Sequence, residues 1–257
     1  MKNEAGSTEP VRLRINSVGR AVNILIEISR SDSGLTAREL SERLGIERPT
    51  TYHLLHTLSA LSMVSRSDDG CVKLGLRVGE LARAFERQFS APEYLVPIVD
   101  HLSRATGETC YAVGWWDGEI VTLAVSRGAH TVRAAEVPRG QYGHAHSRAA
   151  GKLLLSKAPS GRRSTYLASH PLERKTPFTI VDRAALETEF DRIRAADLAL
   201  DREEFAEGVC CLAVPLGGAD APFALALSAP KARFEANETA YIAQATQLSR
   251  ESREMRT

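Results

Sequence analysis

The amino-acid sequence has no apolar run that approaches the roughly 20 residues of a membrane-spanning helix. Its first residues, MKNEAGSTEPVRLR, also lack the apolar core of a secretory signal, so we expect a disordered tail over residues 1–14. These two absences argue against a membrane partner and predict a cytoplasmic protein.

Cysteines are few, and their spacing suits neither a zinc ribbon nor a disulfide framework. The four are Cys71, Cys110, Cys210 and Cys211, and none belongs to a C-x-x-C motif. The charges nearly cancel, with 33 basic and 32 acidic residues, so composition alone does not indicate a nucleic-acid partner. The chain does have 43% apolar residues over 257 positions, enough for a core in one large or two ordinary domains.

Three short helices are predicted near the N-terminus. Apolar side chains recur at helical spacing over residues 17–29. After the polar break SDSGL, Thr36 and Glu39 form a capping-box pattern for a second helix, and Gly45 ends it. A third helix is expected from Pro49, because proline suits the first turn of a helix.

The next segment, MVSRSDDGCVKLG, predicts a small hairpin, because two short alternating runs flank an Asp-Gly turn. The order helix, helix, tight turn, helix, hairpin is typical of a winged helix-turn-helix, which we assign to residues 15–75. An amphipathic segment, residues 76–91, is predicted to be a linker helix that ends before Pro92.

Residues 92–257 show a different pattern and predict a second domain. Two strands rich in Val, Ile, Tyr and Trp surround an Asp-Gly turn. Helices are expected at residues 149–157, at residues 160–168 and after the capping residue Asp182. Two more strands, GVCCLAVPL and FALALSA, precede a closing helix over about residues 235–253. Hairpin strands with helices segregated around them are typical of the α+β class.

Six sequence blocks in a fixed order resemble the IclR family of bacterial transcription regulators. In the first half they are SVGRAVNILIEIS, LTARELSERLGIERPTTYHLLHTLSALSMV and GCVKLGLRVGELA. In the second half they are HSRAAGKLLLS, TPFTIVDRAALETEFDRIR and LALDREEFAEGVCCLAVPL. The resemblance implies a winged helix-turn-helix joined by a helix to a GAF- or profilin-like effector domain. It also implies a homodimer or tetramer that binds double-stranded operator DNA and responds to a small metabolite, often an organic or aromatic acid.

The outward face of the third helix is the predicted DNA-reading surface. A helix-turn-helix buries one side of this helix and presents the other in the major groove. The outward side chains here are basic, hydroxyl-bearing or imidazole groups that can bond phosphates or base edges. The predicted DNA contacts are Thr36, Arg48, Thr50, Thr51, Tyr52, His53, Arg66 and Lys73. The family usually has Arg at the position of His53, and the helical pattern alone leaves a protein-docking module open as an alternative.

The resemblance implies an effector pocket in the second domain. Its predicted residues are Ala145, Arg148, Ala149, Val209, Cys211, Ala226 and Ser228. Arg148 stands where the family has a small residue, directly before a helix whose N-terminus favours anions. We therefore hypothesise that Arg148 binds the carboxylate of the effector. The alternatives are a Cys211 that is only a core residue, a Ser228 bonded to backbone, and an Arg148 that faces solvent or pairs with Glu136.

Metal and phosphate sites are not favoured by the sequence, so no metal and no cofactor is expected. The residues His144, His146, Cys210 and Cys211 are of ligand type but have no recognisable spacing. The segment HSRAAGK lacks the glycine of a phosphate loop, and Lys152 is expected to be solvated.

Catalysis is not favoured either. Glu203 and Glu204 are adjacent and should point opposite ways, so a surface or capping role is expected rather than an acid/base pair. A hydrolase using Cys211 would need a base at a recognisable spacing, and none is found. We therefore expect a regulator and not an enzyme.

Overall fold

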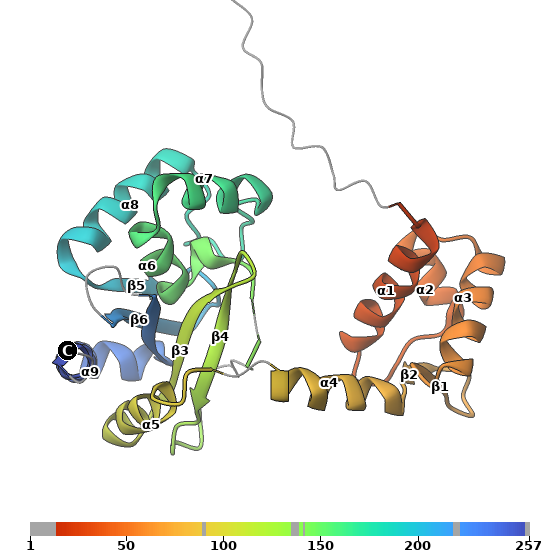
Figure 1. Ribbon diagram of the computed structural model, residues 1–257, viewed down its shortest axis with the longest axis horizontal. Coiled ribbons are helices and arrows are strands. Elements are labelled where there is room, and N and C mark those ends of the chain that lie inside the picture. Colours follow the sequence, from red (N-terminus) through yellow and green to blue (C-terminus); the bar gives the residue numbers. More distant parts are fainter. Residues whose placement is uncertain (1–13, 89–90, 135–138, 141, 218–221, 255–257) are drawn as a thin grey trace, which may run out of the picture. The chain divides into compact units, whose positions relative to one another are not determined.

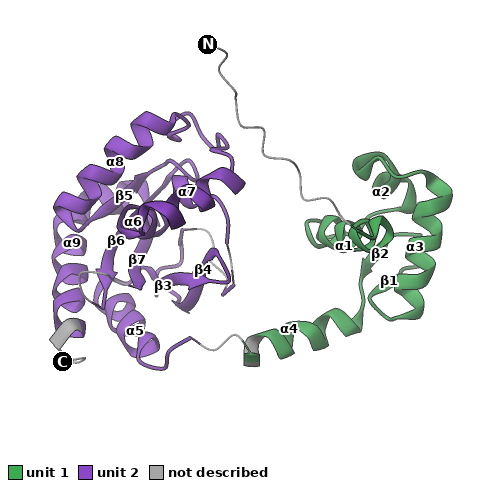
Figure 2. Cartoon of the chain, turned by 45° about the horizontal axis from the view of Figure 1, so that its top comes forward, with its two compact units in different colours: residues 1–89 green, residues 90–257 purple. Residues whose placement is uncertain are grey.

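The computed structural model describes residues 14–88, 91–134, 139–140, 142–217 and 222–254. The chain divides into two compact units, residues 1–89 and 90–257 (Figure 2). The predicted tail, residues 1–14, lies outside the described residues apart from Arg14. Within the described part of the chain, no helix is both long and apolar enough to cross a membrane.

The first unit begins with the three predicted helices, α1 (Asn16–Ser29), α2 (Ala37–Leu44) and α3 (Arg48–Ala60). The capping box is present, because Thr36 and Glu39 each bond the backbone N–H of the other. Gly45 ends α2 at a φ of 61°, which glycine adopts at low cost. Apolar side chains from all three helices form one core, including Ile24, Ile28, Leu40, Leu55 and Leu58.

The predicted wing follows as β1 (Val64–Arg66) and β2 (Val72–Leu74), which pair antiparallel. The segment before α2 extends this hairpin, because the backbone N–H of Leu35 bonds the Val72 carbonyl at 3.0 Å. The helix α4 (Leu76–Gln88) comes next. The elements of a winged helix-turn-helix are therefore all present in the first unit.

The second unit is built on a five-stranded sheet with the order β4-β3-β7-β6-β5, in which every neighbouring pair is antiparallel (Figure 1). The strands are β3 (Thr109–Trp116), β4 (Glu119–Ser126), β5 (Ala199–Arg202), β6 (Val209–Leu216) and β7 (Phe223–Pro230). An antiparallel sheet with helices on its faces is the predicted α+β architecture. The short strand β5 was not predicted, because four residues that include Asp201 and Arg202 give too little apolar alternation.

Helices cover both faces of this sheet. On one face the short 3-10 helix η1 (Ala145–Ser147) leads into α6 (Ala149–Lys157), which packs on β6 and β7, with α7 (Ser160–Ser169) and α8 (Arg183–Ala196) beyond it. On the other face lie α5 (Leu95–Thr106) and α9 (Lys231–Glu254). Gly151 permits the contact between η1 and α6, because a Cβ there would lie 2.3 Å from the Ala145 carbonyl oxygen.

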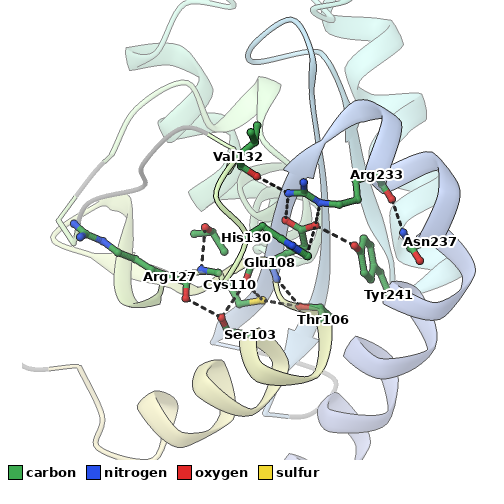
Figure 3. Close-up of polar contacts among 12 residues, drawn as sticks. Ser103, Thr106, Glu108, Cys110, Arg127, His130, Val132, Arg233, Asn237 and Tyr241 are labelled. Carbon is green, nitrogen blue, oxygen red and sulfur yellow. Dashed lines mark hydrogen bonds and ion pairs between the residues drawn. The ribbon is translucent and has the colours of Figure 1, made fainter.

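A polar cluster around the buried Glu108 joins the start of β3 to α9 (Figure 3). The Arg233 guanidinium donates to both carboxylate oxygens of Glu108, and the Tyr241 hydroxyl donates to one of them at 3.1 Å. Arg233 also donates to the Val132 carbonyl at 2.8 Å, and the His130 Nε2 atom lies 3.7 Å from the carboxylate. This cluster therefore fastens α9 and residues 130–132 to the sheet, on the face opposite α6.

Candidate functional site

The outer face of α3 presents polar side chains to solvent. Tyr52 is 54% exposed, and Arg48 and His53 are also exposed, while Thr50 is half-buried. Leu55 and Leu58 point the other way into the core. The predicted division of α3 into a buried side and a presented side is therefore observed.

One of the predicted DNA contacts is corrected by the structure. Thr51 is 0% exposed and donates its hydroxyl to the Glu47 carbonyl at 3.2 Å, so it cannot reach a nucleic acid. Helical spacing had put it at the edge of the outer face, but α3 turns it fully inward. The half-buried Thr36 caps α2, because its hydroxyl donates to the Glu39 carboxylate at 2.7 Å and accepts the Glu39 N–H, and its DNA contact stays a prediction.

A groove runs between α3 and the wing. It is lined by Tyr52, His56, Ser59, Ser65 and Arg66, with apolar side chains beneath them. Arg66 and Lys73 are exposed on the wing strands, as predicted for groups that contact a phosphate backbone. Ser59 and Ser65 were missed, because their nearness depends on how the wing folds back onto α3.

In the second unit, a narrow cavity lies between the sheet and the N-terminus of α6. Among the residues that line it are Tyr111, Val113, Ile120, Tyr142, Ala145 and Arg148. Its interior volume is about 20 Å³, about the space of one water molecule. Small-molecule sites typically hold about 300–1,000 Å³, so an effector would have to move the lining side chains apart.

Arg148 brings a positive charge to this cavity. Its guanidinium lies over the Phe205 ring, 3.8 Å from the centroid, and its Nε atom is buried. No ion pair or hydrogen bond satisfies that guanidinium among the described residues, and Glu136, the proposed alternative partner, lies outside them. Burial lowers the pKa of Arg148, yet arginine remains charged, so an anion in the cavity would meet a cation ready to bind it.

The predicted Cys211 and Ser228 lie behind the cavity wall. They are directly opposite on β6 and β7, with Sγ and Oγ 3.0 Å apart. The Ser228 hydroxyl also meets the Tyr111 hydroxyl at 2.9 Å, and Tyr111 lines the cavity. Ser228 is thus bonded to side chains, neither to backbone nor to solvent. Burial raises the pKa of the Tyr111 and Cys211 groups, so both keep their protons.

The remaining predicted pocket residues divide between the cavity and the core. Ala145 lines the cavity, whereas Ala149 and Ala226 are buried in the core cluster and Val209 packs against it. The alternation along β6 is as predicted, since Cys211 faces α6. Tyr111 and Tyr142 were missed, although alternation along the predicted hairpin strand could have placed Tyr111 on the face that also holds Val113.

A buried charge pair next to the cavity overturns two expectations. Lys152 on α6 is 0% exposed, not solvated, and bonds the carboxylate of Glu204, which is also buried. A second carboxylate, Glu189, lies 3.4 Å from the Lys152 Nζ atom. Burial raises the pKa of Glu204 to about 7, although Lys152 opposes the rise, and burial raises the pKa of Asp201 to about 6. Glu203 does have the predicted capping role, accepting the Gly208 N–H at 2.9 Å.

The alternative metal and thiolate sites gain no support from the geometry. Cys210 and Cys211 occupy opposite faces of β6, and the His146 Nε2 atom contacts the Glu173 carbonyl. In the described ranges, no three His, Cys, Asp or Glu side chains are arranged to hold a metal ion. A Cys211 with a raised pKa is also a poor nucleophile, since the thiolate is the reactive form.

Comparison with known proteins agrees with the two-unit architecture. Residues 92–252 match the family model described as bacterial transcriptional regulator IclR C-terminal, and residues 17–68 match the IclR helix-turn-helix domain. The chain is 32% identical over 243 residues to the HTH-type transcriptional regulator BhcR of Paracoccus denitrificans, covering 91% of this chain and 86% of that protein.

Solved structures share the fold. The crystal structure of the Thermotoga maritima IclR superposes with a TM-score of 0.63 at 22% identity, over 93% of this chain and 99% of that one. An IclR homologue from Microbacterium hydrocarbonoxydans, crystallised with 4-hydroxybenzoate, gives a TM-score of 0.63 at 21% identity, over 90% and 98% of the two chains. The chain therefore belongs to the IclR family of bacterial transcriptional regulators, with a helix-turn-helix DNA-binding domain and a C-terminal effector domain.

Proposed function

We propose that the chain binds a palindromic operator as a homodimer or tetramer and that a small organic acid in the α6 cavity controls this binding. The observation that carries the proposal is the Arg148 guanidinium, which lines the cavity without a carboxylate partner among the described residues. A carboxylate is the ligand group that a guanidinium fork fits best. The homologue crystallised with 4-hydroxybenzoate supports an aromatic acid as one candidate.

For the domains we propose a winged helix over residues 15–75, a linker helix over residues 76–91 and an effector domain from residue 92. On the DNA side, we propose that Thr50, Tyr52 and His53 enter the major groove. The exposure of Tyr52 and His53 on α3, with Thr50 half-buried on the same helix and the groove formed with Arg66 beside them, supports this assignment.

Replacing Thr50 and His53 together by Ala should weaken operator binding by about 1–3 kcal/mol for each base that α3 no longer reads. The measurement is a titration of the full chain against a duplex selected from a random-sequence library. Thr188→Ala, a change of an exposed threonine on α8, is the matched control and should bind like wild type.

The same titration separates DNA binding from a protein-docking role. Phosphate contacts release counterions, so affinity should fall steeply as salt rises. Selection of no duplex, or an affinity unchanged in the double variant, would contradict the assignment of α3 as the reading helix.

Exposed apolar side chains on α1 and α4 support the proposed dimer. Val18, Val22 and Ile26 recur along one side of α1, and Leu81 and Phe85 are exposed on α4. Light scattering should therefore give a dimer or tetramer at micromolar concentration, and Val22→Glu should shift it toward monomer. The neighbouring Asn23→Glu, also on an exposed position, is the control. A wild-type monomer would count against this surface.

A further inference from the structure

The Arg148 side chain lies on an aromatic ring. Its guanidinium carbon is 3.8 Å from the centroid of the half-buried Phe205, within the range of a cation–π contact. Among the described residues, the buried Arg148 Nε atom has no hydrogen-bond partner. The ring therefore supplies a contact where a hydrogen bond is missing. Phe205 is not one of the described residues that line the cavity, so this contact can be changed without changing the cavity wall.

The backbone that carries Phe205 is held by hydrogen bonds. The carboxylate of the buried Asp201 accepts the N–H of Glu204 at 2.7 Å and the N–H of Phe205 at 3.4 Å. The Thr179 hydroxyl donates to the Glu204 carbonyl at 2.6 Å. Both polar groups of the peptide unit between Glu204 and Phe205 are therefore bonded, which fixes the point from which the ring extends.

An ion pair also joins this segment to α6. Lys152 lies one turn after Arg148, and its backbone N–H bonds the Arg148 carbonyl at 2.9 Å. The Lys152 side chain bonds the carboxylate of Glu204, the residue directly before Phe205. One turn of α6 therefore contacts two adjacent residues of the segment. Both charges of the ion pair are buried, so separating them would leave uncompensated charges in the interior.

We propose that Phe205 is a positioning residue for the effector: its ring holds the Arg148 guanidinium at the cavity, and the Lys152–Glu204 ion pair holds the ring. A ring contact uses none of the guanidinium N–H donors, so all of its fork can meet an incoming carboxylate. It also restricts a long side chain before the ligand arrives, which lowers the entropy cost of binding. This inference rests on the proposed function, which supplies the acid.

Calorimetric titration of the full chain tests the role of the ring. The probes are benzoate, 4-hydroxybenzoate, succinate and hexanoate, with the primary amide of the tightest-binding acid as its uncharged counterpart. Phe205→Leu should lower the affinity for that acid about 3- to 30-fold, because the cation loses its ring. The affinity for the amide should change less than about twofold, which a general disturbance of the fold would not produce.

Two further variants locate the effect in the ring. Phe205→Tyr keeps the aromatic face and should bind the acid within about twofold of wild type. Phe178→Leu is the matched control, because Phe178 is 56% exposed and lies next to Thr179 in the chain. It should bind both acid and amide as wild type does.

A double-mutant cycle tests the contact without any ligand. Urea unfolding of the full chain is followed by the fluorescence of Trp115 and Trp116, for wild type, Phe205→Leu, Arg148→Leu and the double variant. Phe205→Leu should raise the unfolding equilibrium constant about 2- to 30-fold more when Arg148 is present than when it is replaced.

The outcomes separate the two proposals. The positioning role is overturned by an unchanged acid affinity in Phe205→Leu, by an equal loss for acid and amide, or by unfolding constants without coupling, while acid binding at Arg148 stands. If wild type binds none of the four acids more tightly than its amide, the proposed function fails, and the role of Phe205 toward the effector fails with it.

Discussion

Replacing Lys152 by Met should lower the free energy of unfolding of the second unit by about 3–5 kcal/mol. Lys152 is fully buried and holds the buried Glu204 carboxylate, with Glu189 at 3.4 Å. Methionine fills nearly the same space, so the loss comes from a carboxylate left in the interior without its cation. Urea unfolding followed by tryptophan fluorescence measures it, because both tryptophans, Trp115 and Trp116, lie on β3 of this unit.

Lys157→Met is the matched control on the same helix. Lys157 pairs with Asp197, whose side chain is about half exposed, at 2.5 Å, so its removal should cost about 0–1 kcal/mol. Adding Glu204→Gln to Lys152→Met should recover part of the loss, because the buried charge is then removed from both partners. If Lys152→Met alone is as stable as wild type, the Lys152–Glu204 pair contributes nothing to the stability of the folded unit.

The pH dependence of the Lys152 variant follows from Glu204. Burial raises the pKa of Glu204 to about 7 in the folded protein, so the folded state binds its proton more tightly than the unfolded chain does. Stability from this group is therefore highest at acidic pH and falls as pH rises toward 7. Loss of Lys152 raises the pKa of Glu204 further, so the difference between variant and wild type should be larger at pH 8 than at pH 6.

Much of the first unit could be predicted because its signals are local. The capping box of Thr36 and Glu39, the glycine that ends α2 and the Asp-Gly turn of the wing each act within a few residues. The inward rotation of Thr51 could not be resolved from spacing, because a residue at the edge of a helical stripe is turned in or out by its tertiary contacts.

The second unit shows where local pattern stops being informative. Lys152 follows a glycine in a segment of mixed polarity, and only its bond to Glu204, 52 residues further along the chain, explains its burial. Tyr111 joins the site through the pairing of β3 with β7, which sets its hydroxyl against Ser228. Arg148 was identified because its chemistry and its place before a helix are both visible in the sequence.

Arg148→Ala should weaken the binding of an acidic effector by about 2–5 kcal/mol, the usual cost of removing one partner from a buried charge pair. That is a loss of roughly 30- to 5,000-fold in affinity. The affinity of the Arg148→Lys variant should lie between those of wild type and Arg148→Ala, since lysine keeps the charge but loses the planar fork. Calorimetric titration of the full chain with the tightest-binding acid from a panel of small carboxylic acids that includes 4-hydroxybenzoate measures both losses.

An uncharged ligand gives the internal control for Arg148. The primary amide of the same acid has nearly the same shape without the negative charge, so Arg148→Ala should change its affinity little. The variant should also fold at least as well as wild type, because the Arg148 cation has no carboxylate partner among the described residues and its burial costs free energy. A lower affinity for acid and amide alike would indicate a collapsed cavity, and an acid affinity that equals wild type would place the carboxylate away from Arg148. Only a loss confined to the acid, with melting temperature retained, identifies Arg148 as the charge that selects the effector.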